Sequence, residues 1–175
     1  MEDTVFDVRH TFQLTSTELA ELQTLLDLVY AGDFSPEDWD HALGGLHTLA
    51  WRDGQLIGHA SVVQRAVLVG VEPYRAGYVE GMGVHPDWQG QGIGRALMQR
   101  VNDQMARGYD FGLLSPSDEG RPLYAQAGWV DWRGELRCFT PTGMIVTPDE
   151  EIMAYGPPRS VWEPLTCDYR SGDVW

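Results

Sequence analysis

The chain has 175 residues, with 26 acidic side chains against 12 basic ones and a formal net charge of −14. This length suits one well-buried domain and is short for two, so we expect a single domain over residues 1–175. A chain this acidic is a poor partner for nucleic acid, and no apolar run approaches the length that spans a membrane. Because residues 1–4 carry no basic and apolar leader, we expect a soluble, cytoplasmic protein without nucleic-acid or membrane partners.

The N-terminal part is typical of a strand followed by two capped helices. The apolar spacing over residues 5–12 predicts the strand. Thr15 and Glu18 form a capping box, which predicts a helix over Ser16–Tyr30. A serine cap and a proline at the first helical position then predict a short helix over residues 36–44.

The next part indicates a meander of strands. Asp53-Gly54 stands between the apolar runs 46–51 and 55–64, and Asp-Gly in this place is a strong hairpin signal. A further apolar run over 66–71 predicts a third strand.

The most informative stretch is a strand, a glycine-rich turn and a helix in immediate succession. Gly77–Val84 reads as a strand that Pro86 ends, because proline cannot donate to a ladder. Gln89–Gly94 is the turn, and apolar residues at helical spacing follow as far as Met105. Free backbone N–H groups at such a helix start can surround a pyrophosphate, and Arg95 adds a positive charge.

Two familiar phosphate loops do not fit this turn. The Walker loop requires a lysine, and the chain has none. The dinucleotide fingerprint requires Gly or Ala at the position of Arg95. An ordinary turn without a ligand remains the alternative to a pyrophosphate site.

The second half alternates short elements. Phe111–Leu114 predicts a buried strand, and a polar loop over 115–119 follows. The sequence from Arg121 to Gly128 predicts a short helix, and a strand over 129–139 comes next. The cysteines Cys138 and Cys167 lack a metal-ligand or redox spacing, so we expect inert thiols.

Two motifs resemble the GNAT acetyltransferase superfamily. One is Val84-His85-Pro86 followed by Gln89-x-x-Gly92-x-Gly94 at a helix start, and the other is Leu123-Tyr124-x-x-x-Gly128-Trp129. The resemblance implies an α/β (α+β) GNAT fold with a mixed, mostly antiparallel central sheet flanked by helices. It implies that this sheet is splayed between its fourth and fifth strands, with acetyl-coenzyme A in the split. The cofactor residues that it implies are Met82, Gly83, Val84, Gln89, Gly90, Gln91, Gly92, Ile93, Gly94, Arg95, Ser115 and Tyr124.

Acetyl transfer to an amine needs a base, a donor for the oxyanion and an acid for the leaving thiolate. Glu80 is our candidate base, because strand alternation puts it on one face with Met82 and Val84. The alternative for Glu80 is an exposed strand carboxylate. The resemblance implies that the Val84 N–H steadies the oxyanion. Tyr124 is the candidate acid, and simple core packing is its alternative.

Other chemistry has little support in the sequence. No Gly-x-Ser-x-Gly elbow is present, and no pair of the five histidines has a metal-site spacing, so neither a nucleophilic enzyme nor a metal is expected.

Within the superfamily, segments spread over the whole chain resemble the aminoglycoside 2'-N-acetyltransferases. They are Ala31–Phe34, Asp38-Trp39, Gly77–Gly81, Thr147–Asp149 and Gly172–Trp175. The resemblance implies an aminoglycoside as substrate, a role in antibiotic resistance, and a homodimer. It implies an acceptor site of Asp33, Asp38, Glu80, Asp173 and Trp175, joined by Glu150 or Glu151.

The alternatives belong to two classes. A GNAT enzyme for another cationic amine, such as a polyamine or a peptide, would explain the fold and the negative charge. A non-catalytic acyl-coenzyme A sensor would explain only the glycine turn. Asp33 and Asp38 have their own alternative, in which they are helix-dipole acids over a packed Trp39.

Overall fold

The computed structural model describes residues 4–175, which form two compact units. The first unit holds the residues up to Val63 together with Val79–Val101, and the second holds Gln64–Tyr78 together with Asn102–Trp175. Strands β3 and β4 and helix α3 contribute residues to both units. The prediction that no leader precedes the domain rests mainly on residues 1–3, which lie outside the described residues.

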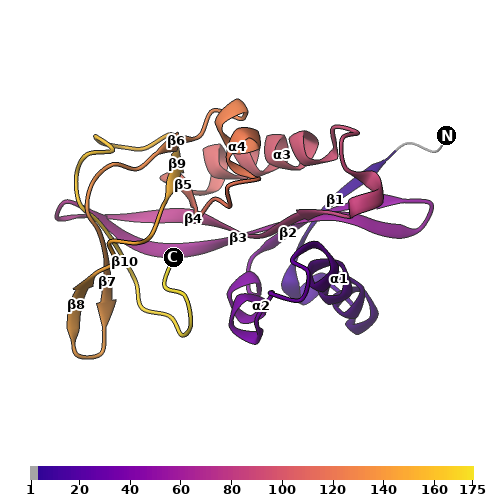
Figure 1. Ribbon diagram of the computed structural model, residues 1–175, viewed down its shortest axis with the longest axis horizontal. Coiled ribbons are helices and arrows are strands. Elements are labelled where there is room, and N and C mark those ends of the chain that lie inside the picture. Colours follow the sequence, from indigo (N-terminus) through magenta and orange to yellow (C-terminus); the bar gives the residue numbers. More distant parts are fainter. Residues whose placement is uncertain (1–3) are drawn as a thin grey trace. The chain divides into compact units, whose positions relative to one another are not determined.

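The first unit contains helices on both faces of a short antiparallel sheet (Figure 1). Strand β2 pairs with β1 on one side and with β3 on the other. Alternate residues of β2 point to opposite faces, so that Leu49 packs with α1 and Ala50 packs with α3. Its elements, including those shared with the second unit, are β1 (Val5–His10), the 3-10 helix η1 (Thr11–Gln13), α1 (Ser16–Val29), α2 (Pro36–Ala42), β2 (Leu46–Arg52), β3 (Gln55–Val69), β4 (Glu72–Val84), the 3-10 helix η2 (Pro86–Trp88) and α3 (Ile93–Gly108).

The second unit pairs its strands in a mixed pattern. Strand β4 pairs in parallel with β5, and β7 pairs in parallel with β10. The pairs β5–β9, β6–β9, β3–β10 and β7–β8 are antiparallel. The remaining elements are β5 (Phe111–Leu114), α4 (Arg121–Gln126), β6 (Val130–Asp131), β7 (Leu136–Thr140), β8 (Gly143–Val146), β9 (Met153–Tyr155) and β10 (Leu165–Cys167). The predicted α/β (α+β) class with a mixed, mostly antiparallel sheet is confirmed.

The local signals in the sequence identify most elements correctly. The predicted capping box forms, with Thr15 accepting from the amide of Glu18, and the predicted serine cap forms as well, with Ser35 accepting from the amide of Asp38. The hairpin turn has positive φ at both Asp53 and Gly54, 51° and 76°, as a two-residue turn of this kind requires. The predicted apolar stripe of α3 is buried along its whole length.

Three predicted strand boundaries are wrong. Phe12 leaves the first strand for η1, where its side chain is 81% exposed. Residues 66–71 do not start a new strand, because β3 continues to Val69 through the buried Arg65, whose charge is paired with Asp168. Strand β4 begins at Glu72, five residues earlier than predicted.

The predicted strand over residues 129–139 divides into β6 and β7. Between them, the amides of Arg133 and Gly134 both donate to the carbonyl of Val161. A Cβ at Gly134 would lie 1.9 Å from the carbonyl oxygen of Glu163, so this segment is pressed against another loop. That close packing takes the chain out of the ladder and requires glycine.

Two buried histidines face each other in the first unit. Neither His47 nor His59 has any exposed surface, and His47 Nδ1 lies 2.9 Å from His59 Nε2. Burial lowers the pKa of His47 to about 4, with a contribution from the nearby His10. Burial also lowers the pKa of His59 to about 3, with a contribution from His47. Both rings are therefore neutral at pH 7.

We predict that this pair makes the protein acid-sensitive. An unfolded histidine titrates near about pH 6.5, so below that pH the unfolded chain binds more protons than the folded one and stability falls. Between pH 6.5 and pH 5 the loss is about 2 kcal/mol for each histidine. Urea unfolding at pH 7 and pH 5 measures it. A His47→Gln, His59→Asn double variant should lose less stability over this range, whereas a His41→Gln control should behave as wild type. Equal losses in all three proteins would contradict the assignment.

Candidate active site

The glycine-rich turn before α3 leaves an open cradle of backbone amides. Gly90 and Gly92 have φ of 73° and 82°, and a Cβ at either position would meet nothing within 4 Å. The Gly92 carbonyl accepts the first helical bond, from Ala96, so the amides of residues 93–95 precede the hydrogen-bonded ladder. Arg95 is exposed in the first turn of the helix. The turn therefore presents free donors and positive charge, which suit a pyrophosphate.

The side chain of Gln89 forms a hydrogen bond with the backbone of the protein. Its side-chain amide donates to the carbonyl of Val84 at 3.1 Å, across the turn that η2 makes. The side chain of His85 accepts from the amide of Asp87 in the same turn, at 3.2 Å. The glutamine of the motif therefore ties the end of β4 to the start of the glycine turn.

Sequence reasoning missed a second arginine beside this turn. The guanidinium of Arg52 donates to Gln91 Oε1 at 3.1 Å and lies 4.8 Å from the ring centroid of Trp88. Arg52 closes the β2–β3 hairpin, 39 residues before Gln91. No short motif links two such distant segments, and only the folded sheet brings this charge to the glycine turn.

The end of β4 is held by side chains. The carbonyl of Glu80 accepts from Ser61 Oγ at 3.2 Å, that of Gly81 lies 2.7 Å from His59 Nδ1, and that of Met82 accepts from Tyr30 Oη at 3.1 Å. Successive carbonyls of a regular strand point to opposite edges of the sheet and accept from neighbouring strands. Three consecutive carbonyls that are hydrogen-bonded to side chains therefore indicate an irregular strand.

Gly81 is the centre of this irregularity. Its φ is 55°, a left-handed conformation that favours glycine, so the extended backbone is interrupted there, an irregularity that we call the Gly81 bulge. Glu80, Met82 and Val84 are half-buried, whereas Gly81 and Gly83 are buried. A Cβ at Gly83 would lie 2.6 Å from Val29 Cγ1, so β4 presses its glycine face onto α1. The alternation matches the predicted common face of Glu80, Met82 and Val84.

The pairing of β4 with β5 is short. Ala76–Tyr78 pairs with Phe111–Leu113, and β4 continues to Val84 beyond this ladder. This agrees with the predicted splay between the fourth and fifth strands. Ser115 follows the end of β5 and is exposed.

Tyr124 is a buried residue of α4 in the second unit. Its ring lies against Gly120, where a Cβ would be 2.9 Å from Tyr124 Cε2. Burial raises the pKa of Tyr124 to about 12, so its hydroxyl keeps its proton at neutral pH. Tyr124 and the Glu80–Val84 segment belong to different units, and the predicted pairing of Tyr124 with Glu80 and Val84 stays a prediction.

The two predicted acceptor acids of the first unit differ in their surroundings. Asp33 is exposed, directly after the residues that end α1. Asp38 is half-buried, and its Oδ2 accepts from both the amide and the hydroxyl of Ser35 at 2.9 Å. Trp39 packs against the leucine core around α1. The alternative in which the acids belong to a helix start over a packed Trp39 therefore describes Asp38 well. Asp33 is the more exposed of the two acids.

In the second unit the chain's last residues fold back onto the loop before β9. The ring of Trp175 is buried, and its Nε1 donates to Thr147 Oγ1 at 2.8 Å. The pKa of Glu150 is raised by burial and by the negative charges of Asp173 and Asp149, against the effect of Arg170. The structure therefore brings Glu150 near Asp173 and seats Trp175 on the loop that carries Thr147, while the acceptor role of these residues stays a prediction.

Arg65 anchors this tail. It is 3% exposed, and it donates to Asp168 Oδ1, to the Asp168 carbonyl and to the Val174 carbonyl at 2.8, 2.8 and 2.7 Å. Its guanidinium also lies 5.8 Å from the ring centroid of Trp175. A planar fork with several donors suits such a three-way contact, which lysine could not reproduce.

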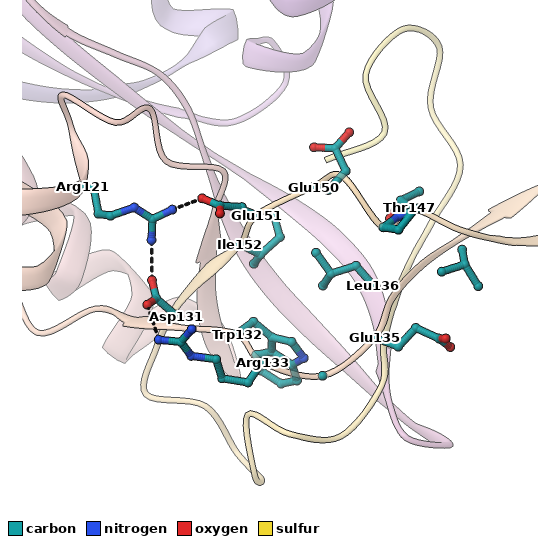
Figure 2. A pocket seen from close by; sticks show the side chains of 13 residues that line it. Arg121, Asp131, Trp132, Arg133, Glu135, Leu136, Thr147, Glu150, Glu151 and Ile152 are labelled. Carbon is teal, nitrogen blue, oxygen red and sulfur yellow. Dashed lines mark hydrogen bonds and ion pairs between the residues drawn. The ribbon is translucent and has the colours of Figure 1, made fainter.

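Two neighbouring glutamates, Glu150 and Glu151, line a cavity of about 460 Å³ (Figure 2). Glu151 is ion-paired with Arg121, which also binds Asp131. Glu150 points away from this ion-pair network (Figure 2). Both glutamates line the cavity, and Glu150 is the one of the two that lies outside the ion-pair network of Arg121.

The described residues, 4–175, contain no group of three or more His, Cys, Asp or Glu side chains placed to hold a metal ion. Both cysteines are buried, as expected for inert thiols. No helix in the described part of the chain is long and apolar enough to cross a membrane.

Comparisons with known proteins identify the family and the fold. The acetyltransferase (GNAT) family model matches residues 13–129. The fold resembles Escherichia coli ElaA, with a TM-score of 0.63 and 16% identity over 87% of this chain and 99% of that one. It also resembles the ribosomal-protein-S18-alanine N-acetyltransferase of E. coli, with a TM-score of 0.58 and 21% identity over 86% of this chain and 93% of that one.

The chain belongs to the GNAT family of acetyltransferases, and it is an enzyme of that class. It is also 37% identical to the aminoglycoside 2'-N-acetyltransferase of Mycolicibacterium fortuitum, over 96% of this chain and 93% of the relative. The resemblance predicted from the sequence is thereby confirmed.

Proposed function

We propose that the protein transfers an acetyl group from acetyl-coenzyme A to the 2'-amine of aminoglycosides and so confers resistance to them. The observation that carries this proposal is the likeness to the M. fortuitum enzyme along nearly the whole chain. The neighbouring carboxylates of Glu150 and Asp173 support it, because a local excess of negative charge suits a cationic sugar. Asp33, Asp38 and Glu80 stay predicted acceptor residues.

The glycine turn fits coenzyme A. A Cβ at Gly90 or Gly92 would enter the open space in front of the free amides, so glycine keeps room for a pyrophosphate there. Arg95 and Arg52 would supply positive charge, while Gln89 would shape the turn through Val84. When bound, acetyl-coenzyme A supplies an activated thioester, which the amine attacks directly without an acyl-enzyme.

The protein's residues would then manage protons and charge. An alkylammonium has a pKa near about 10, so at neutral pH it needs a base to free its lone pair, and we assign this role to Glu80, directly or through a water. The Val84 N–H would donate to the oxyanion. Tyr124 would donate to the leaving thiolate. Because its pKa is raised to about 12, a hydrogen bond is favoured over complete proton transfer.

A cytoplasmic location and a homodimer stay predictions. We also propose that the two compact units work together as the single domain expected from the sequence.

The first experiment measures thiol release from acetyl-coenzyme A with pairs of aminoglycosides that carry either a 2'-amine or a 2'-hydroxyl. We expect turnover only with the amine-bearing members. Turnover on a polyamine or a peptide alone would assign another acceptor to the same enzyme. No thiol release on any amine would favour the acyl-coenzyme A sensor.

We predict that Glu80→Gln lowers kcat at pH 7 by about 10²-fold or more, because the amine then lacks its base. The rate should recover toward pH 9–10, where the amine loses its proton to solvent. Glu72→Gln is the matched control, since Glu72 is exposed at the start of the same strand. If Glu80→Gln matches wild type at every pH, another group must be the base.

We predict that Tyr124→Phe lowers kcat by about 10²-fold while KM for acetyl-coenzyme A changes little. The loss should shrink with an acetyl thioester of a more acidic thiol, which leaves without help. Tyr169→Phe, at an exposed tyrosine of the same unit, is the control. A loss that is the same for both thioesters would remove Tyr124 from the leaving-group step.

A further inference from the structure

A directional chain of hydrogen bonds runs through the buried histidine pair. A carbonyl can only accept, so His59 Nδ1, at 2.7 Å from the Gly81 oxygen, carries the hydrogen. In a neutral ring His59 Nε2 must then accept, and it does so from His47 Nδ1 at 2.9 Å. His47 Nε2 in turn accepts from Thr11 Oγ1 at 2.7 Å, and that hydroxyl accepts from the amide of Gly44 at 2.8 Å.

Each link fixes the tautomer of the next. Both rings must be Nδ1–H tautomers, and each uses its two nitrogens once, as donor and as acceptor. A protonated ring would have no acceptor nitrogen, so the chain exists only while both histidines are neutral. The low pKa values that burial gives them meet this condition at pH 7.

This chain of hydrogen bonds ends at the Gly81 bulge of β4. The carbonyl of Gly81 takes the last hydrogen bond, and the φ of Gly81 is 55°. Ser61, two residues after His59 on the same face of β3, donates to the carbonyl of Glu80 at 3.2 Å. Two side chains of β3 thus hold the two peptide carbonyls that flank the Cα of Gly81.

This chain of hydrogen bonds does not conduct protons. A carbonyl oxygen has no hydrogen to pass on, so a proton arriving from His59 could go no further. The hydrogen bonds instead hold the groups that they join in one orientation, because a buried and fully satisfied network has one low-energy arrangement. Bulges beside active sites commonly set the aim of a neighbouring side chain.

We infer that His47 and His59 are positioning residues for Glu80: their hydrogen-bond chain fixes the Gly81 bulge and thereby the direction of the adjoining carboxylate. This inference rests on the proposed function in one respect, the role of Glu80 as the base. A misplacement of about 1 Å at a reacting group can cost about 10²-fold in rate. An effect of this size is enough to explain a buried hydrogen-bond network that positions Glu80.

The first test examines the wild-type protein itself. Long-range proton–nitrogen NMR of the imidazoles at pH 7 should show His47 and His59 both as Nδ1–H tautomers. Single His→Asn variants assign their signals. An Nε2–H tautomer at either residue would reverse the chain and overturn the inference, whatever the activity of the protein.

The second test compares variants on any amine that the wild type acetylates. His59→Leu removes the donor to Gly81 and should lower kcat by about 10²-fold, with KM for acetyl-coenzyme A within about twofold of wild type. His59→Asn keeps an amide donor near the Nδ1 position and should recover most of the rate. Leu49→Met, a change of similar volume at a buried apolar residue of the same strand as His47, is the control and should keep the wild-type rate.

A double-mutant cycle then separates positioning from general damage. If His59 acts through Glu80, the Glu80→Gln, His59→Leu protein is no slower than Glu80→Gln alone. Additive losses, no recovery in His59→Asn, or an equal loss in Leu49→Met would each overturn the inference. The proposed function fails separately, when the wild type acetylates another amine but no aminoglycoside, and the cycle is then measured on that amine.

Discussion

The candidate site depends on how the last residues of β4 satisfy their backbone carbonyls. Those of residues 80, 81, 82 and 84 accept from the side chains of Ser61, His59, Tyr30 and Gln89. A buried carbonyl without a donor is costly, so a strand can leave its ladder only where other donors take over. These four side chains are such donors, and they allow β4 to bulge at Gly81 and to end in the glycine turn.

The same segment explains why small residues and buried polar residues occur together. Gly83 lets the strand lie against Val29, and Gly81 adopts a φ that other residues avoid. The histidines behind them are fully buried and are neutral because burial disfavours their charged form. Polar groups in this core therefore act as fixed hydrogen-bond donors, without carrying charge into it.

Charge is divided in a way that suits the two proposed ligands. Backbone amides with Arg52 and Arg95 gather at the glycine turn, although the chain as a whole has a net charge of −14. In the second unit Arg65 binds the tail that carries Asp173, while burial and the nearby charge of Asp173 both raise the pKa of Glu150. Like charges held close together at such a cost are typical of functional sites.

The sequence by itself determined the features that depend on near neighbours in the chain. The helix caps at Thr15 and Ser35, the Asp53-Gly54 hairpin and the strand, turn and helix around Gln89–Gly94 were correctly predicted, because their signals lie within a few residues of one another. Only the tertiary structure decided which side chains meet across long intervals. It brought Arg52 to the glycine turn, kept β3 continuous through the paired Arg65, and tied Glu151 to Arg121 while leaving Glu150 beside Asp173. These contacts depend on packing between distant segments, for which a single sequence carries no periodic signal.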